Sequence, residues 1–197
     1  MSTVQRRLTA YLDESQSNRS RDPDCYVLAA ALCDPTELEI ARTAMASLLL
    51  PGQTKVHWRD EQPARKRKIA ETIAQLPLMH LIVVRDGRPG ERAERRRRHC
   101  LERMLFELDE LEVARAIAES RGRADDLRDR RLLDAQRAKQ AVSSELLIDH
   151  VPGPKDPLLW VPDAVCGAIT LARTGNPGYL DMIETAVAVQ VIRIVAP

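Results

Sequence analysis

The sequence is poor in aromatic residues, which make up 3% of its 197 residues as one Phe, three Tyr and two Trp. A surface that binds single strands mainly by stacking bases on aromatic rings is therefore disfavoured. The charges also nearly cancel, with 30 Lys and Arg against 29 Asp and Glu, so the chain is not a histone-like polycation. Any affinity for nucleic acid must come from local clusters of basic side chains.

Cysteine is sparse as well, and the four residues lie far apart without a CxxC pair: Cys25, Cys33, Cys100 and Cys166. A zinc knuckle or a thioredoxin-like site is disfavoured, and buried free thiols are expected instead. The N-terminus opens polar, and no apolar run approaches the roughly 18 residues that a membrane span needs. These absences predict a protein of the reducing cytoplasm that has no membrane partner.

Strand and helix patterns alternate along the chain. Cys25–Cys33 (CYVLAAALC) is a continuous apolar run of strand length, whereas residues 91–111 repeat their apolar side chains at helical spacing. The predicted strands are 7–13, 25–33, 78–85, 113–119, 146–151 and 187–195, and the predicted helices are 35–50, 62–76, 91–111, 124–141 and 162–173, with another starting at Pro177. The polar residues 14–24 are predicted to be a hairpin loop, which makes the first two strands antiparallel. The whole pattern predicts one α/β domain, 1–197, with a mixed sheet.

Three acidic residues lie at positions that a metal-dependent phosphoryl-transfer site requires. Asp13 ends the first predicted strand, Glu119 ends a central strand, and Asp163 lies in the first turn of a helix. Open α/β sheets place ligand sites at strand ends, and hard divalent cations prefer clustered carboxylate oxygens. The sequence therefore predicts a Mg²⁺ or Mn²⁺ site formed by these three residues. Glu14, next to Asp13, is a further catalytic candidate.

Each of the three carboxylates also has a structural alternative. Asp13 could be a loop residue at a strand end, and Glu119 could be a solvated charge at the edge of the sheet. Asp163 stands at a helix N-terminus, where the helix dipole alone stabilises a carboxylate. The prediction of a site depends on the combination of the three carboxylates and on the sequence motifs around them.

Those sequence motifs resemble the motifs of a known family. Residues 11–15 (YLDES), followed by an apolar strand, resemble the opening of an uncharacterised bacterial RNase H-like family, domain of unknown function three thousand eight hundred. Four further stretches are similar to that family, in the same order: 55–58 (KVHW), 99–110 (HCLERMLFELDE), 119–121 (ESR) and 161–169 (VPDAVCGAI). The resemblance spans nearly the whole chain and is carried by the order and spacing of short motifs. It implies an RNase H-like mixed sheet flanked by helices, with an acidic metal site at Asp13, Glu119 and Asp163.

The chain departs from the family pattern in ways that bear on catalysis more than on fold. RNase H-like nucleases commonly have Asp at the fourth strand, where this chain has Glu119, and Asp125 or Asp126 could substitute for it. A second carboxylate on the first long helix has only Glu37 and Glu39 as positional candidates. The family often has an acid shortly before the position of His57, and here that neighbourhood holds Lys55.

His57, in the segment KVHWRDE, is the remaining catalytic candidate. It could ligate a metal, contact a phosphate or transfer a proton, because the charge of histidine changes near neutral pH. The alternative is a loop histidine that is hydrogen-bonded to a carbonyl. His80, within LMHLIVV, is predicted to be a hydrogen-bonded core residue, while His99 and His150 carry no signal.

Dense basic runs supply candidates for phosphate contacts. They comprise residues 65–68, Arg92 with 95–98, and Arg121, Arg123, Arg128, Arg130 and Arg131. Such runs bind phosphates by counterion release when several face one groove. The residues predicted to contact nucleic acid are Arg65, Lys66, Arg121 and Arg123. The alternative is a solvated helix face, paired with acids such as Glu91, Glu94 and Glu102.

Together these features predict a Mg²⁺- or Mn²⁺-dependent phosphodiesterase that acts on RNA or DNA. One alternative is a non-catalytic nucleic-acid- or protein-binding module on the same fold, with incomplete metal ligands. Another is an assembly subunit, possible as a homodimer, whose helix 100–111 and strand 187–195 form the interface. Metal-dependent thermal stability separates the enzyme from both alternatives.

Overall fold

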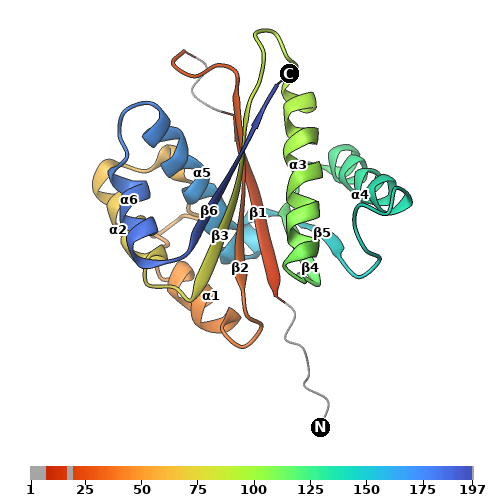
Figure 1. Ribbon diagram of the computed structural model, residues 1–197. Helices are drawn as coiled ribbons and strands as arrows, with labels where there is room; N and C mark the ends of the chain where they lie inside the picture. The colour runs from red at the N-terminus through yellow and green to blue at the C-terminus, as the bar shows by residue number, and fades with distance from the viewer. Residues whose placement is uncertain (1–7, 17–19, 197) are drawn as a thin grey trace.

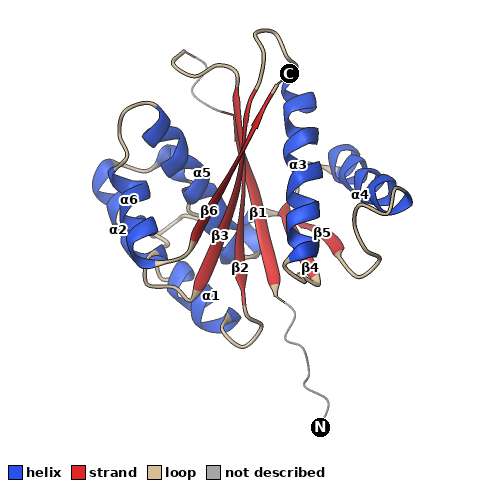
Figure 2. Cartoon of the chain, in the orientation of Figure 1, coloured by secondary structure: helices blue, strands red, loops and turns tan. Residues whose placement is uncertain are grey.

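The centre of the protein, seen in a computed structural model that describes residues 8–16 and 20–196, is a six-stranded mixed sheet (Figure 2). Its strands are β1 Thr9–Gln16, β2 Cys25–Cys33, β3 Leu78–Asp86, β4 Arg115–Glu119, β5 Leu147–Val151 and β6 Val189–Val195. They lie side by side in the order β5-β4-β1-β2-β3-β6. β2 is antiparallel to both of its neighbours, and the other neighbouring pairs are parallel. All strands except β2 therefore end at the same edge of the sheet.

Helices cover both faces of the sheet, as Figure 1 shows. One face carries α1 Leu38–Ala46, α2 Pro63–Ile73, α5 Trp160–Arg173 and α6 Gly178–Ala186, and the other carries α3 Ala93–Glu110 and α4 Arg123–Ala138. Successive side chains of a strand point to opposite faces. In β1, Tyr11 packs in the core under α5, and Leu12 packs in the core under α3. The next two residues repeat this alternation, so Asp13 lies on the α5 face and Glu14 on the α3 face.

The mixed α/β sheet flanked by helices confirms the predicted fold class. All nine residues of β2 are buried, as its continuous apolar run predicts. The four cysteines are free and buried, also as predicted. Within the described part of the chain, no helix is long and apolar enough to cross a membrane.

Several predicted boundaries were wrong by a few residues. β1 continues to Gln16, into the predicted hairpin loop, because Ser15 and Gln16 still pair with β2. The first helix begins at Leu38 rather than Pro35, because the side chain of Asp34 accepts hydrogen bonds from the backbone and hydroxyl of Thr36 and holds a turn there. α5 begins at Trp160, two residues before the predicted Pro162. Residue 7, the predicted start of the first strand, lies outside the described residues.

His80, in β3, is buried as predicted, but the prediction that it is hydrogen-bonded was wrong. Within the described residues neither of its ring nitrogens has a hydrogen-bond partner. Burial without a partner disfavours the charged ring and lowers the pKa of His80 to about 4. The side chain therefore remains neutral at physiological pH.

Candidate active site

Asp13 and Glu119 lie beside each other on the α5 face of the sheet. The parallel register pairs Leu12 with Ala118, so the next residue on each strand is one of the two acids. Ile117 packs in the core under α5, and the alternation along β4 places Glu119 on the same face as Ile117. α5 packs across β1 and β2 on this face, and its first turn carries Asp163. The three predicted acids are thus on one side of the sheet.

The electrostatics of Asp13 reflect this crowding of acids. Burial raises the pKa of Asp13 well above its usual range, and the negative charges of Asp163 and Glu119 raise it further. The backbone N–H of Glu14 donates to Oδ1 at 2.8 Å and acts in the opposite direction. Asp13 forms no ion pair with a basic side chain among the described residues. Asp13 therefore lies where a proton or a cation is needed to relieve like-charge repulsion.

Asp163 is held from the loop that precedes α2. Its Oδ2 accepts a 2.8 Å hydrogen bond from the backbone N–H of Trp58 and lies 3.1 Å from Nδ1 of His57. This contact with Asp163 raises the pKa of His57. The Trp58 ring lies against α5 at Gly167, where a Cβ would come within 2.0 Å of the ring. Glycine at this position therefore lets Trp58 approach closely enough to bind the Asp163 carboxylate.

Glu119 is held by a basic residue and by a close loop. The Lys55 ammonium lies 2.6 Å from Oε1 of Glu119, whereas Oε2 is buried and has no hydrogen-bond partner within the described residues. Gly153, in the 3-10 helix Gly153–Lys155, approaches so closely that a Cβ there would lie 2.5 Å from Oε1. The carbonyl of Gly153 in turn accepts a 2.8 Å hydrogen bond from Nε1 of Trp160.

The fit of a divalent cation depends on these three carboxylates. Within residues 8–16 and 20–196, no group of three or more His, Cys, Asp and Glu side chains is arranged to hold a metal ion. Carboxylates are nevertheless the donors that Mg²⁺ and Mn²⁺ prefer, and the unpartnered Oε2 of Glu119 beside the crowded Asp13 is a place where positive charge would be accepted. These residue types thus suit such a cation, but as the structure places the described side chains the three carboxylates do not form a metal site.

A groove of about 770 Å³ is lined by one of the three candidate acids, Asp163. Its lining includes His57 and Asp163 together with the basic side chains of Arg59 and Lys66. The Lys66 ammonium lies 5.8 Å from the centroid of the Trp58 ring. Lys66 thus lines the same groove as Asp163, and Arg59 is a basic residue of this groove that the sequence did not single out.

The predicted residue Arg65 lies outside this groove. It forms an ion pair of 3.4 Å with Glu61, and its guanidinium donates to the carbonyl of Leu48 at 2.5 Å. Arg123 begins α4 on the other face of the sheet and lines a separate cavity with Asp126 and Arg130. These two predicted contacts are not brought together with Lys66.

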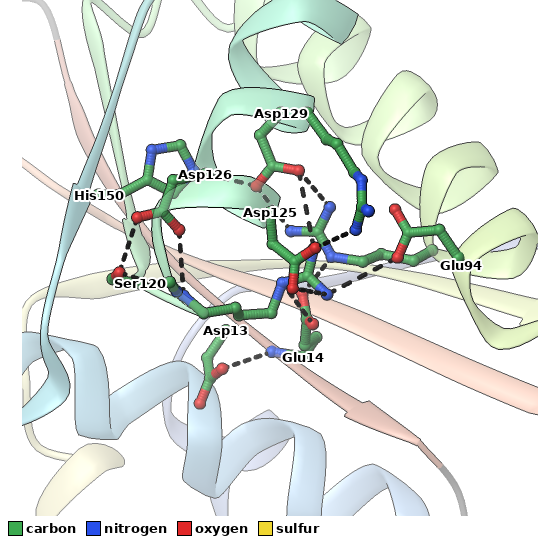
Figure 3. A network of polar contacts seen from close by, with 12 residues as sticks. Asp13, Glu14, Glu94, Ser120, Asp125, Asp126, Asp129 and His150 are labelled. Atoms are coloured by element: carbon green, nitrogen blue, oxygen red, sulfur yellow. Dashed lines mark hydrogen bonds and ion pairs between the residues drawn. The ribbon is translucent and has the colours of Figure 1, made fainter.

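Glu14 belongs to a different cluster, on the α3 face. Its carboxylate lies 2.8 Å from Nε of Arg97 and 3.2 Å from Nε of Arg121. Arg97, only 4% exposed, also makes a bidentate contact with Asp129, whose Oδ2 lies 3.0 Å from Nε2 of His150. Figure 3 shows the Asp13 carboxylate directed away from this network. The carboxylate of Glu14 is therefore paired with two arginines, although Glu14 also lines the groove that contains Asp163.

The partners of Glu14 could not be recognised in the sequence. Arg97, Asp129 and His150 come from α3, α4 and β5, and only the packing of these elements brings them together. Burial alone would raise the pKa of Asp129, but the contacts with His150 and Arg97 outweigh it and hold that pKa below its usual value. The network is thus a matched set of charges.

The alternative acids considered for the site have other roles. Asp126 accepts hydrogen bonds from the Ser120 hydroxyl at 2.7 Å and the Arg121 backbone at 3.1 Å, which fixes the start of α4. Asp125 pairs with Arg128. Glu39 pairs with Arg42 at 2.7 Å, and Glu37 is the cap residue before α1. Glu119 therefore does not need a substitute for its place beside Asp13.

No family model and no curated protein sequence matches the chain. Solved structures do match it over most of its length. Ribonuclease H2 from Pyrococcus horikoshii OT3 is 15% identical with a TM-score of 0.54, and the match covers 88% of this chain and 75% of that one. The RNase HII of Archaeoglobus fulgidus, in its complex with PCNA, is 16% identical with a TM-score of 0.53, over 88% and 76% of the two chains. Bst-RNase HIII in complex with Mn²⁺ is 14% identical with a TM-score of 0.57, over 87% of this chain and 54% of that one. The chain therefore has an RNase H-like fold, which confirms the predicted fold.

Proposed function

We propose that the protein is a nuclease, a phosphodiesterase that cleaves RNA or DNA with the help of Mg²⁺ or Mn²⁺. The observation that carries the proposal is the location of Asp13, Glu119 and Asp163 on one face of an RNase H-like sheet, with the pKa of Asp13 raised by burial and by the other two acids. Acidic groups that are crowded together in this way are commonly functional, because a folded protein seldom keeps them without a partner.

The proposal assigns distinct roles to the residues of the site. Asp13, Glu119 and Asp163 would hold the cation, which when bound supplies Lewis-acid activation of a phosphodiester and of the attacking water. His57, hydrogen-bonded to Asp163, would orient that carboxylate and hold a proton at Nε2. Lys66 and Arg59 would bind phosphates of the substrate in the adjoining groove.

Other observations support the proposal at a coarser level. The structural neighbours are ribonucleases by name, and one of them is in complex with Mn²⁺. The motifs quoted above support membership of the uncharacterised RNase H-like family, and we expect the protein to act in the cytoplasm. Arg65, Arg121 and Arg123 are further proposed contacts to nucleic acid outside the groove.

The experiment that tests the proposal is a cleavage assay. The purified chain is given single-stranded RNA, single-stranded DNA, both duplexes and an RNA–DNA hybrid, each with Mg²⁺, Mn²⁺ or a chelator. We expect cleavage of at least one substrate with a divalent cation and none with chelator. Asp163→Ala should abolish cleavage but retain binding, because phosphate affinity comes from basic side chains.

One control variant and two contradicting outcomes make the assay decisive. Asp181→Ala changes an exposed acid in the first turn of α6 and should cleave like the wild type. Cleavage that survives unchanged in both Asp13→Asn and Asp163→Ala would come from a contaminant and would refute the site. Binding of nucleic acid without any cleavage or metal binding would favour a non-catalytic binding module instead.

A further inference from the structure

Arginine side chains gather on the face of the sheet that α3 and α4 cover, opposite α5 (Figure 1). Two adjoining cavities, of about 570 and 810 Å³, lie there and share Arg92 and Arg95. Together they are lined by eight arginines and three acids, although basic and acidic residues are almost equal in number over the whole chain. We call the exposed arginines of both cavities the arginine surface, which comprises Arg88, Arg92, Arg95, Arg98, Arg128 and Arg131.

The acids of these cavities are already bound by other, less exposed arginines. The pairs are Glu91 with Arg85 at 2.8 Å, Asp129 with Arg97, and Glu94 with Arg121 at 3.8 Å. By contrast, Arg88, Arg92 and Arg131 form no ion pair with any residue that the structure describes. Arg95 and Arg98 pair with nearby acids but remain 70% and 60% exposed, and such surface pairs are weak. The arginine surface is thus available to a further anion.

The spacing of the arginine surface fits a chain of phosphates. Arg92, Arg95 and Arg98 recur every three residues from the N-cap of α3, about 4.5 Å apart along the helix axis. Arg128 and Arg131 form a second row on α4, and both rows line the larger cavity. A guanidinium keeps its charge at any physiological pH and can bind two oxygens of one phosphate. Two rows of such groups can therefore bind successive phosphates of a nucleic acid.

The other residues that line the two cavities favour a duplex as the partner. None of the described lining residues is Phe, Tyr or Trp, whereas single strands are held by stacking their bases on aromatic rings. Protein interfaces have an apolar core, and here Leu132 is the only branched aliphatic side chain among the described lining residues. A duplex encloses its bases and presents its phosphates, so basic side chains are sufficient to bind it.

We propose that the arginine surface binds the phosphate backbone of double-stranded nucleic acid. It lies on the face of the sheet opposite Asp13 and Asp163, and it is separate from the groove that Lys66 lines. The inference goes beyond the proposed nuclease and does not depend on a metal site, because contacts between guanidinium groups and phosphates need no cation.

Fluorescence anisotropy with short labelled DNA and RNA duplexes tests the inference, with chelator present so that no divalent cation takes part. The wild type should bind, and its log Kd should rise linearly with the logarithm of the salt concentration. Combining Arg92→Gln with Arg131→Gln should raise Kd about tenfold and lower the slope by about two, since each phosphate contact contributes about 0.9. Combining Arg92→Lys with Arg131→Lys keeps both charges and should retain most of the slope.

A second double variant is the matched control. Arg115→Gln with Arg193→Gln removes the same charge from exposed arginines at the start of β4 and on the edge strand β6, and should bind like the wild type. Because Arg92 and Arg131 form no ion pair, their removal should leave Tm unchanged. If that double variant does not fold, Arg131→Gln alone replaces it, with half the expected change in slope.

The outcomes are distinguishable from those of the cleavage assay. A wild type that binds no duplex, or equal affinities in the two double glutamine variants, overturns the inference. Binding of poly-dT or polyglutamate as tight as that of a duplex, and weakened by the same two substitutions, would assign the surface to single strands or to an acidic protein and overturn the duplex. Duplex binding that depends on these arginines, without cleavage of any substrate, would support the arginine surface and refute the nuclease.

Discussion

Asp13 and Glu14 are neighbours in the chain, yet they lie in opposite electrostatic surroundings. Asp13 faces two other carboxylates, and its pKa is raised. Glu14, on the other face of the sheet, lies between the guanidinium groups of Arg97 and Arg121. The alternation of a single strand thus separates a cluster with excess negative charge from a network in which each acid has a basic partner.

On this difference we propose that the paired network is structural and that the cluster around Asp13 is functional. Buried charges that are paired and hydrogen-bonded hold elements together, and in the network they join β1, α3, α4 and β5. Unpaired like charges cost stability, and they are retained where a ligand will neutralise them. Comparing substitutions in the two clusters therefore tests the assignment of each.

The largest effect is expected in the paired network. Asp129→Asn leaves the buried Arg97 with one carboxylate fewer, and we expect the free energy of unfolding to fall by about 3–5 kcal/mol, as is typical when one partner of a buried pair is removed. Urea unfolding followed by circular dichroism measures the change.

The control for this substitution lies on the same helix. Asp125→Asn removes a partner of Arg128, which is 59% exposed, and should cost no more than about 1 kcal/mol. Equal losses in the two variants would mean that the network is no more important to the fold than a surface ion pair.

The second-largest effect is expected in the pH dependence of stability, where two buried histidines differ. His150 has Asp129 as a partner, whereas His80 has none within the described residues. Because the pKa of His80 is lowered to about 4 from an ordinary value of 6.5, the unfolded chain takes up a proton first as the pH falls. The stability contributed by neutral His80 is complete above pH 6.5 and is lost toward pH 4, by about 3 kcal/mol at about 1.4 kcal/mol per pKa unit.

His80→Leu should remove this loss, while its stability at pH 7.5 should equal or exceed that of the wild type, since no hydrogen bond is broken. Urea unfolding at pH 7.5 and 4.5 measures the difference, with His99→Gln on the surface of α3 as the matched control. The same acid-induced loss in His80→Leu and in the wild type would show that other groups cause it.

The smallest effects, with opposite signs, are expected at the two adjacent acids. Glu14→Gln weakens two contacts to arginine and should cost about 1–3 kcal/mol in the absence of metal. Asp13→Asn relieves like-charge repulsion and should leave the metal-free protein unchanged or more stable by about 1 kcal/mol. It should also abolish any rise in Tm caused by Mn²⁺, which Glu14→Gln should retain. A large loss of stability in metal-free Asp13→Asn would assign Asp13 a structural role.

Much of the fold could be predicted because its signals are local. The continuous apolar run of Cys25–Cys33 is a buried central strand, and the order of strands and helices predicts a mixed sheet. The end of β1 could not be predicted, because polar Ser15 and Gln16 extend the strand only by pairing with β2. A polar strand end and a polar loop look alike until the partner strand is in place.

The positions of the three candidate acids in the fold could also be predicted from local signals. Asp13, Glu119 and Asp163 stand at element ends, and the alternation of the strands brings the first two to the face on which α5 lies. The separation of Glu14 from this group, and the pairing of Lys55 with Glu119 across 64 positions of the chain, depend on tertiary packing alone. No periodicity or short motif in the sequence predicts such contacts.

The two tryptophans lie close to the candidate site, so their intrinsic fluorescence can report on it. The backbone of Trp58 binds Asp163, and the indole of Trp160 binds the carbonyl of Gly153, the residue that lies against Glu119. The sequence contains no other tryptophan. Tryptophan emission, excited selectively at the red edge of the absorption band, therefore originates entirely from two buried rings, each one contact away from a carboxylate of the candidate site. A change in the charge or position of those carboxylates can thus be followed by fluorescence in the unlabelled protein, without the background of a distant chromophore.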